Sequence, residues 1–254
     1  MKILASDYDG TLKGVNGIIE ESDIKAISTF REAGHKFGIV TGRSLVRLQT
    51  DFEKFGVEAD FFIGTNGGII ADSGYNKIMS YDIDFNRAIN FIERYKSRED
   101  ISLAVGDGYR TVRLSRLDDT PDFSQYGASG SFEDICKNKT INSFVIGLKH
   151  PGLRSRLIDE FTGEYGDCMN FHQNMTIIDI SANGVYKSTG LEYVKNIYKT
   201  EELYVIGDEL NDIEMIKKFK GFCVTNARAE VKECAAKVFD SVASCIEYIW
   251  KLDN

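Results

Sequence analysis

Proline is almost absent from this chain, which has only 2 among its 254 residues. Proline-rich and disordered chains have the opposite composition, so the low proline content, together with 43% hydrophobic residues, excludes both classes. That much apolar material can form one large hydrophobic core or two modest ones. We therefore expect a folded, globular chain.

Long apolar runs are also missing. No segment approaches the roughly 20 consecutive apolar residues of a membrane-spanning helix. Asp7 and Asp9 interrupt the apolar stretch at the amino terminus, so we expect no secretion signal. The net charge of -8 disfavours nucleic acid and anionic membranes as partners. These features predict a cytoplasmic protein with neither kind of partner.

Cysteine and histidine form no ligand pattern. The five cysteines are an odd number and include no CxxC pair, which favours free thiols in a reducing compartment. His35, His150 and His172 are scattered along the chain, so we expect no histidine cluster for zinc. The first strand is followed by DYDGTL and not by GxGxxG, which disfavours a dinucleotide-dependent oxidoreductase.

Short apolar strands alternate with amphipathic helices in the first part of the chain. Ile24, Ile27 and Phe30 recur at helical spacing, and Ser22 and Asp23 can cap the start of that helix. This βαβαβ pattern is typical of a parallel sheet whose functional loops lie at the carboxyl ends of the strands. The predicted strands are 2–7, 36–42 and 60–68, the last of which ends in a Gly-rich loop, and the predicted helices are 24–33 and 44–55.

The middle of the chain has a different pattern. Its strands alternate polar and apolar residues in places, which favours an antiparallel sheet with one face covered by helices. The predicted strands are 103–115, 141–148 and 168–181, and the predicted helices are 89–97 and 154–166. We therefore predict an α+β domain over 83–183, inserted into a discontinuous α/β domain over 1–82 and 184–254. In the tail, the predicted strands are 202–208 and 221–227, and the predicted helices are 188–199, 210–219, 230–238 and 245–252.

Four short motifs stand at strand ends or just before a helix of the α/β domain. They are Asp7-Tyr8-Asp9, Thr41-Gly42, Lys187, and the segment GDELND over 207–212. Strand ends converge at one edge of a doubly wound sheet. Two carboxylates one residue apart repel each other unless a cation neutralises them, and carboxylate oxygens suit Mg²⁺. A hydroxyl and an ammonium group suit phosphate.

These motifs, in this order, resemble those of the haloacid dehalogenase superfamily of phosphohydrolases: DYDGTL, then TGR, then a lysine, then GDELND. The large insertion between the second and third motifs is similar to that of the Cof-like branch, and so is the turn Thr65-Asn66-Gly67-Gly68. The resemblance covers nearly the whole chain and implies a doubly wound, Rossmann-like core with an inserted α+β cap. The chain departs from the family pattern in having Tyr8 between the acids, Ser188 after the lysine, and Glu209 inside the last motif.

The resemblance implies a role for each motif. Asp7 would be the nucleophile that forms an aspartyl-phosphate, and Asp9 the general acid and then the base. Asp7, the backbone carbonyl of Asp9, and Asp208 would hold Mg²⁺. Thr41, Gly42 and Lys187 would bind the phosphoryl oxygens, while Asp212 would orient Lys187 or hold metal-bound water. Weaker substrate candidates are Arg43, Asn66, Gly67 and Asn211 in the core and Arg110, Arg113 and His172 in the cap.

The implied function is a Mg²⁺-dependent phosphatase of small phosphorylated metabolites, such as sugar phosphates or a phosphorylated cofactor. A large cap over the site favours a small-molecule phosphate ester over a phosphoprotein. A phosphomutase or phosphotransferase would use the same motifs, and a non-enzymatic phosphate-accepting regulator is a further alternative. Both a monomer and a homodimer are compatible with the sequence.

Overall fold

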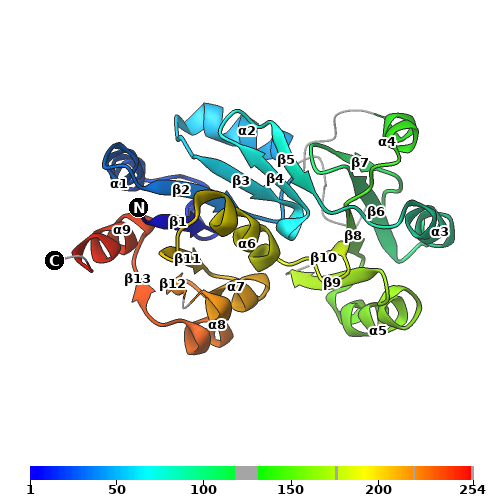
Figure 1. The fold of residues 1–254 in the computed structure, drawn as a ribbon. Coiled ribbons are helices and arrows are strands. Elements are labelled where there is room, and N and C mark those ends of the chain that lie inside the picture. The colour runs from blue at the N-terminus through cyan, green and yellow to red at the C-terminus, as the bar shows by residue number, and fades with distance from the viewer. Residues whose placement is uncertain (118–130, 175–176, 220, 253–254) are drawn as a thin grey trace.

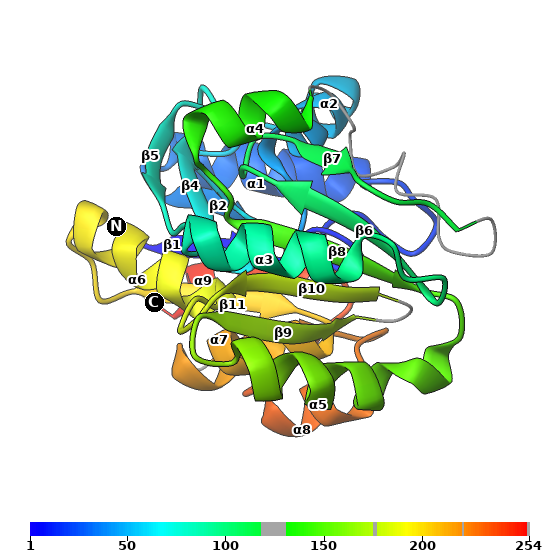
Figure 2. The ribbon, with the colours of Figure 1, turned by 90° about the vertical axis from the view of Figure 1, so that its right-hand side faces the viewer.

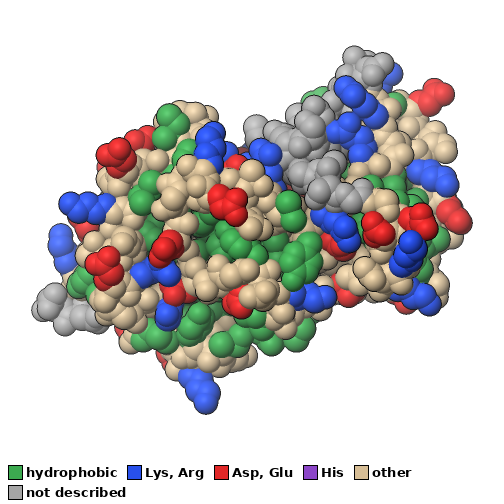
Figure 3. Space-filling view, turned by 90° about the horizontal axis from the view of Figure 1, so that it is seen from above, with side chains coloured by type: hydrophobic (Ala, Val, Ile, Leu, Met, Phe, Trp, Pro, Cys, Tyr) green, Lys and Arg blue, Asp and Glu red, His purple; other side chains and the backbone are tan. Residues whose placement is uncertain are grey.

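The computed structural model describes residues 1–117, 131–174, 177–219 and 221–252. Two sheets lie beside each other in Figure 1, and both chain termini lie on the far side of the larger sheet from the smaller one. Within the described residues, no helix is long and apolar enough to cross a membrane. On the left of Figure 3, over the half of the molecule that contains the larger sheet, basic side chains are interspersed with acidic ones.

The larger sheet has the strand order β13-β12-β11-β1-β2-β3-β4-β5. Its strands are parallel from β13 to β3, and β4 and β5 run antiparallel to their neighbours. These strands are β1 (Ile3–Ser6), β2 (Lys36–Val40), β3 (Phe61–Gly64), β4 (Ile69–Asp72), β5 (Lys77–Ser80), β11 (Leu203–Gly207), β12 (Phe222–Val224) and β13 (Val238–Phe239).

The direction of the chain across this sheet reverses at β1. From β1 the chain moves outward to β2 and β3, while β11, β12 and β13 extend from the other side of β1. Right-handed crossovers then place helices on both faces, as in a doubly wound sheet. The helices of this half are α1 (Glu21–Glu32), α2 (Leu45–Phe55), α6 (Lys187–Tyr198), α7 (Ile213–Lys218), α8 (Ala229–Cys234) and α9 (Val242–Lys251).

The smaller sheet is antiparallel throughout, with the order β7-β6-β8-β10-β9. In Figure 2 its helices lie in front of it, and the larger sheet lies behind. One face is therefore covered by helices, and the other is turned towards the larger sheet. The elements are α3 (Phe85–Tyr95), β6 (Ile101–Gly106), β7 (Thr111–Arg113), α4 (Phe132–Asn138), β8 (Ser143–Leu148), α5 (Arg154–Tyr165), β9 (Met169–Asn174) and β10 (Ile177–Ala182).

Two strands predicted as single elements are hairpins. The predicted strand 103–115 is divided into β6 and β7, because Gly108 adopts a positive φ of 89° and the Asp107 carboxylate accepts the backbone N–H groups of Tyr109 and Arg110. The predicted strand 168–181 is divided into β9 and β10, and its residues 175–176 lie outside the described part of the chain. Polar alternation identified these strands, but it did not reveal the turns within them.

The third predicted strand ends at Gly64, and the Gly-rich loop predicted after it begins with a 3₁₀ turn over Thr65–Gly67. The β4–β5 hairpin that follows was missed in sequence analysis. One predicted helix cap was wrong. Asp23 does not cap α1, whose first residue is Glu21; it is buried instead, and its carboxylate accepts the backbone N–H of Ala243 at 2.7 Å in the first turn of α9. The Asp23 carboxylate therefore caps α9 instead of α1.

Each sheet has its own cluster of buried apolar side chains. One cluster joins the parallel sheet to its helices, and the other joins the helix-covered face of the smaller sheet to α3 and α5. The division at 82/83 and 183/184 stays a prediction. In the smaller cluster, the Phe91 ring lies 4.7–5.3 Å, between ring centroids, from those of Tyr95, Phe144, Phe161 and Tyr165.

We expect Phe91→Ala to lower the free energy of unfolding by about 3–5 kcal/mol, because it removes the ring that joins α3, β8 and α5 and leaves a cavity. Chemical denaturation measures the change. Ile197→Ala, at a side chain 46% exposed on α6, is the control and should change stability by about 0.5 kcal/mol or less. Equal effects of the two variants would contradict this account of the core.

Candidate active site

The predicted motifs meet at the carboxyl ends of β1 and β11, which are neighbours in the larger sheet. Asp7 follows β1 and Asp208 follows β11, at the point where the strand order reverses. The strands themselves are buried, whereas their ends open towards the smaller sheet (Figure 1). Open α/β sheets bind ligands at this position.

A tight turn after Asp9 brings the first motif against the last. Gly10 has a φ of 88°, and a Cβ atom on it would lie 2.2 Å from a carboxylate oxygen of Asp208, so no larger residue fits. The Thr11 hydroxyl donates to the other Asp208 oxygen at 2.5 Å, and the Asn226 side chain donates to the Gly10 carbonyl at 2.8 Å. Sequence analysis did not identify Thr11 or Asn226.

Lys187 is completely buried between two carboxylates. Its Nζ lies 2.5 Å from Oδ1 of Asp7 and 2.5 Å from Oδ1 of Asp212. Burial alone would lower the pKa of Lys187, but the charges of Asp212 and Asp7 outweigh it and raise this pKa. The other oxygen of Asp212 accepts the backbone N–H groups of Asp208 and Glu209, each at 2.9 Å. Asp212 therefore fixes both the ammonium group and the end of β11.

Three buried carboxylates, those of Asp7, Asp208 and Asp212, have oxygens within 4.8 Å of one another. Burial raises the pKa of Asp7, partly offset by Lys187. Burial also raises the pKa of Asp208 to about 6, against the lowering effect of the Thr11 hydrogen bond. Such crowding favours a cation, and the all-oxygen donor set suits a hard divalent ion. Because Asp212 is occupied by Lys187 and backbone groups, Asp7 and Asp208 are the acids that fit a metal.

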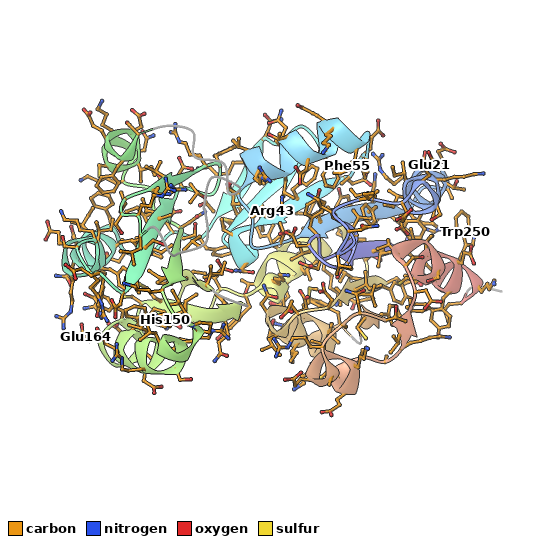
Figure 4. The ribbon with its side chains drawn as sticks, turned by 180° about the vertical axis from the view of Figure 1, so that it is seen from behind. Glu21, Arg43, Phe55, His150, Glu164 and Trp250 are labelled. Atoms are coloured by element: carbon orange, nitrogen blue, oxygen red, sulfur yellow. The ribbon has the colours of Figure 1, made fainter. Side chains whose placement is uncertain are left out.

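Asp9 is bound by Arg43 and not by Lys187. Nε and Nη2 of Arg43 donate to its two oxygens at 2.6 and 2.5 Å, while Nη1 donates to Asp51 at 2.9 Å. The Asp51 oxygen also accepts Lys13 Nζ at 2.8 Å and the Tyr8 hydroxyl at 3.0 Å. Figure 4 labels Arg43 near the middle of the molecule, between the two halves.

Asp51 and Lys13 were missed by sequence analysis, although Asp51 carried a signal. It lies three residues after Leu48 and one before Phe52, both in the apolar stripe predicted for the helix 44–55, so an acid there is directed towards the core. Buried acids require partners. The partner set explains Tyr8, the residue that departs from the family pattern: its hydroxyl reaches Asp51 under the site.

Thr41 and Gly42 follow β2, and Thr41 is buried with its hydroxyl accepting the backbone N–H of Arg43 at 3.2 Å. The weaker candidates Asn66 and Asn211 contact each other, because the Asn211 amide donates to the Asn66 side-chain oxygen at 3.0 Å. Asn66 has a φ of 55°, in the left-handed region. Its turn therefore connects the third strand of the sheet to the last motif.

Gly67 completes this turn with a φ of 103°. A Cβ atom there would lie 2.0 Å from the carbonyl oxygen of Tyr186, the residue before Lys187. Gly67 is therefore a packing residue beneath the site, and its substrate role remains a prediction. The substrate roles of Arg43, Asn66 and Asn211 also remain predictions.

A cavity of about 570 Å³ opens above the motifs. Its wall combines predicted residues with ones that sequence analysis missed, and one of the latter, Asp179, belongs to β10 of the smaller sheet. The side chains or backbone of these residues line it: Asp7, Asp9, Gly10, Lys13, Gly14, Val15, Gly17, Thr41, Gly42, Arg43, Asp179, Asp208, Glu209, Asn211 and Asn226. Lys187 lies beneath this wall, in contact with Asp7.

The three cap candidates do not line this cavity among the described residues. Arg110 is paired with Asp107 at 3.0 Å in the β6–β7 turn. Arg113 lies on β7, at the edge of the smaller sheet. His172 lies on β9, and its Nε2 is 2.8 Å from the Ser181 hydroxyl.

Comparison with known proteins matches residues 4–244 to the family model described as haloacid dehalogenase-like hydrolase. The chain is 25% identical over 260 residues to the 5-amino-6-(5-phospho-D-ribitylamino)uracil phosphatase YcsE of Bacillus subtilis (strain 168), covering 99% of this chain and 96% of that protein.

Solved structures share the fold. A haloacid dehalogenase-like hydrolase from B. subtilis has a TM-score of 0.82 at 19% identity, covering 99% of this chain and all of that one. The subclass IIB sugar phosphatase BT4131 has a TM-score of 0.77 at 19% identity, covering 100% of this chain and 99% of that one. The predicted combination of a doubly wound core and an α+β cap is therefore confirmed.

Without divalent metal at pH 8, we expect Asp208→Asn to raise the free energy of unfolding by about 1–3 kcal/mol. The pKa of Asp208 is raised from its ordinary value of 3.8 to about 6, so its contribution to stability is complete below about pH 4 and is lost as the pH rises through 6. Chemical denaturation from pH 4 to pH 8 in a chelator measures the gain, which should appear across that window. The exposed control Asp240→Asn should show no such window.

Added Mg²⁺ should oppose this stability advantage of Asp208→Asn. We expect it to stabilise the wild type by about 2–3 kcal/mol at a hundredfold excess over its dissociation constant, and Asp208→Asn far less. Thermal and chemical denaturation with and without Mg²⁺ measure the difference. Equal stabilisation of both proteins would show that Asp208 is not a ligand.

Proposed function

The chain belongs to the haloacid dehalogenase-like hydrolases and is a phosphatase, and from this premise we propose that it hydrolyses small phosphate monoesters with Mg²⁺ through an aspartyl-phosphate. One observation carries the proposal: the Asp7 carboxylate lines the cavity while one of its oxygens is held by the buried Lys187. A buried carboxylate held in a fixed orientation beside an ammonium group is suited to nucleophilic attack on an anion.

In the proposed first step, the free oxygen of Asp7 attacks phosphorus and the bond to the leaving oxygen breaks. Lys187 contacts the other oxygen of Asp7, and Lys187, the Thr41 hydroxyl and the Gly42 backbone N–H would be the donors for the phosphoryl oxygens. These groups stabilise the charge that develops in the transition state. Asp212 keeps Lys187 in place through the 2.5 Å contact.

Asp7, Asp208 and the backbone carbonyl of Asp9 would hold Mg²⁺. When bound, this ion would neutralise the clustered acids and stabilise negative charge on the transferring group. The raised pKa values of Asp7 and Asp208 support a cation there, because burial and, to a smaller extent, the neighbouring carboxylates disfavour their charged forms.

Asp9 would donate a proton to the leaving oxygen. It would then take a proton from the water that attacks the aspartyl-phosphate, which releases inorganic phosphate and restores the Asp7 carboxylate. Because Arg43 holds both oxygens of Asp9, this ion pair must open before the proton moves. Asp51 and the Tyr8 ring, 4.9 Å from the Arg43 guanidinium carbon, keep Arg43 beside the cavity when Asp9 leaves.

Small substrates fit best, because the smaller sheet borders the cavity through Asp179. The B. subtilis relative is named for a phosphorylated ribitylamino-uracil, and BT4131 is named a sugar phosphatase. We propose sugar phosphates or a phosphorylated cofactor precursor as the substrate class. The proposal includes a cytoplasmic location and the division into a core over 1–82 and 184–254 and a cap over 83–183.

We expect Mg²⁺-dependent release of inorganic phosphate from a panel of sugar phosphates and small phosphate esters. Asp7→Asn should lower that rate about a thousandfold or more, because it removes the nucleophile. Colorimetric detection of phosphate measures both rates, and Asp240→Asn is the matched control.

Three other outcomes are informative. An unchanged rate in Asp7→Asn would overturn the assignment of the nucleophile. No release from any ester by the folded, Mg²⁺-loaded wild type would contradict the proposed substrate class. A requirement for a bisphosphate activator would indicate phosphoryl transfer to a sugar in place of water.

A further inference from the structure

The turn between β6 and β7 joins the smaller sheet to the larger one at the start of α2. The backbone N–H of Leu45 donates to the carbonyl of Gly108 at 3.0 Å, and that of Val46 donates to the carbonyl of Tyr109 at 2.9 Å. Leu45 and Val46 are the first two residues of α2. The first N–H groups of a helix have no acceptor within the helix, so this turn supplies two acceptors that α2 itself cannot provide.

Two further contacts hold the same turn against the larger sheet. The Tyr109 hydroxyl accepts the backbone N–H of Lys77 on β5 at 2.8 Å, and Tyr109 packs against the apolar cluster of that sheet. Gly108 has a φ of 89°, and a Cβ atom on it would lie 2.7 Å from Cδ1 of Ile69 on β4. The turn is therefore seated closely on the larger sheet and cannot leave it without breaking these hydrogen bonds.

The buried carboxylate of Asp107 determines the shape of the turn. Its Oδ1 accepts the backbone N–H groups of Tyr109 at 3.0 Å and Arg110 at 2.9 Å, and its Oδ2 accepts Nε of Arg110 at 3.0 Å. An aspartate that binds the backbone two residues ahead fixes a tight turn. Asp107 therefore sets the direction of the two carbonyls that bind α2.

The second motif, over 41–43, ends two residues before α2 begins. The larger sheet holds the motif through the turn over 65–66, whose two backbone N–H groups donate to the carbonyls of Arg43 and Thr41, each at 2.9 Å. The smaller sheet holds the helix that follows, through the β6–β7 turn. The motif is therefore supported from both sheets.

We propose that Asp107 is a positioning residue for the reaction. Through the β6–β7 turn it fixes the first turn of α2, which in turn fixes Thr41, Gly42 and Arg43 beside the phosphoryl group. A displacement of such groups by a fraction of an ångström slows a reaction, because developing charge is stabilised only in a fixed geometry. The second motif then has its reactive arrangement only while the turn is docked on the larger sheet. The inference rests on the proposed function, because it concerns the phosphate-binding side of that same site.

Amide hydrogen exchange tests the structural step without any substrate. In the wild type, we expect the N–H groups of Leu45 and Val46 to exchange at least about a hundredfold more slowly than exposed amides, because each has an acceptor. Asp107→Ala removes the carboxylate that shapes the turn and should speed the exchange of both amides about tenfold or more. Asp107→Asn keeps a side-chain oxygen for the same backbone N–H groups, so it should retain the protection.

Release of phosphate from the panel of esters tests the catalytic step. Per mole of folded protein, Asp107→Ala should lower kcat/KM about tenfold, and Asp107→Asn should retain most of the activity. The loss should be equal for every ester, because the second motif would contact the phosphoryl group that all esters share. A residue that contacted the leaving group would instead change the order of preference among the esters, and that result would contradict the inference.

Asp72→Ala is the matched control. Asp72 also shapes a hairpin turn, in which its Oδ1 accepts the backbone N–H groups of Gly74 and Asn76, each at 2.9 Å. The turn that it shapes joins β4 to β5, whereas the N–H groups of Leu45 and Val46 donate to the β6–β7 turn. The variant should therefore change neither the exchange of these two amides nor kcat/KM.

Unchanged slow exchange of both amides in Asp107→Ala would overturn the inference, and so would a loss of protection at unchanged kcat/KM. A merely structural role predicts faster exchange throughout the chain, including the strands of the larger sheet, and no loss of kcat/KM per mole of folded protein. A wild type that releases phosphate from no ester contradicts the proposed function, whereas the exchange of the two amides does not depend on that outcome.

Tyr109→Phe takes the place of Asp107→Ala if that variant does not fold. It keeps the ring on the apolar cluster and removes only the hydroxyl that accepts the backbone N–H of Lys77. Exchange should become faster at the amides of Lys77, Leu45 and Val46, and kcat/KM should fall by an equal factor for every ester. Faster exchange at Lys77 alone, with kcat/KM unchanged, would overturn the inference.

Discussion

The contact between one buried ammonium group and two carboxylates organises the site. Lys187 follows Asp7 by 180 residues in the sequence, yet its Nζ lies 2.5 Å from Oδ1 of both Asp7 and Asp212. Removing one partner from such a buried set costs several kcal/mol, because the remaining charges are unpaired. The fold must therefore bring three charged groups together: Asp7 at the end of β1, Asp212 in the last motif and Lys187 at the start of α6.

The positions of the motifs were predictable because each depends on local signals. A short apolar run followed by polar residues marks the end of a buried strand, and parallel strands place such ends at one edge. The order of DYDGTL, TGR, Lys187 and GDELND was sufficient to identify the family, which the match over 4–244 confirmed. The resemblance, and not composition or periodicity, suggested a chemical role for each residue.

The remaining features depend on contacts between distant parts of the chain. Asp51 was missed in sequence analysis because its partners, Tyr8, Lys13 and Arg43, lie on other elements. Asp23 was wrongly assigned to the start of α1 because its partner is the backbone N–H of Ala243 in α9. Asp179 was missed because alternation along β10 shows that its side chain faces away from Ile178 and Ile180, but not what that face meets. The turn between β6 and β7 was missed for a simpler reason, since the single pair Asp107-Gly108 was sufficient to reverse the chain.

The two faces of the smaller sheet contact different parts of the molecule. Ile178 and Ile180 hold the helices on one face, whereas Asp179 lines the cavity from the other. A substitution at Asp179 would change the wall of the cavity without removing a side chain from that apolar cluster or a reacting group from the larger sheet. The wall of the cavity can therefore vary on the smaller sheet while the larger sheet keeps the reacting groups.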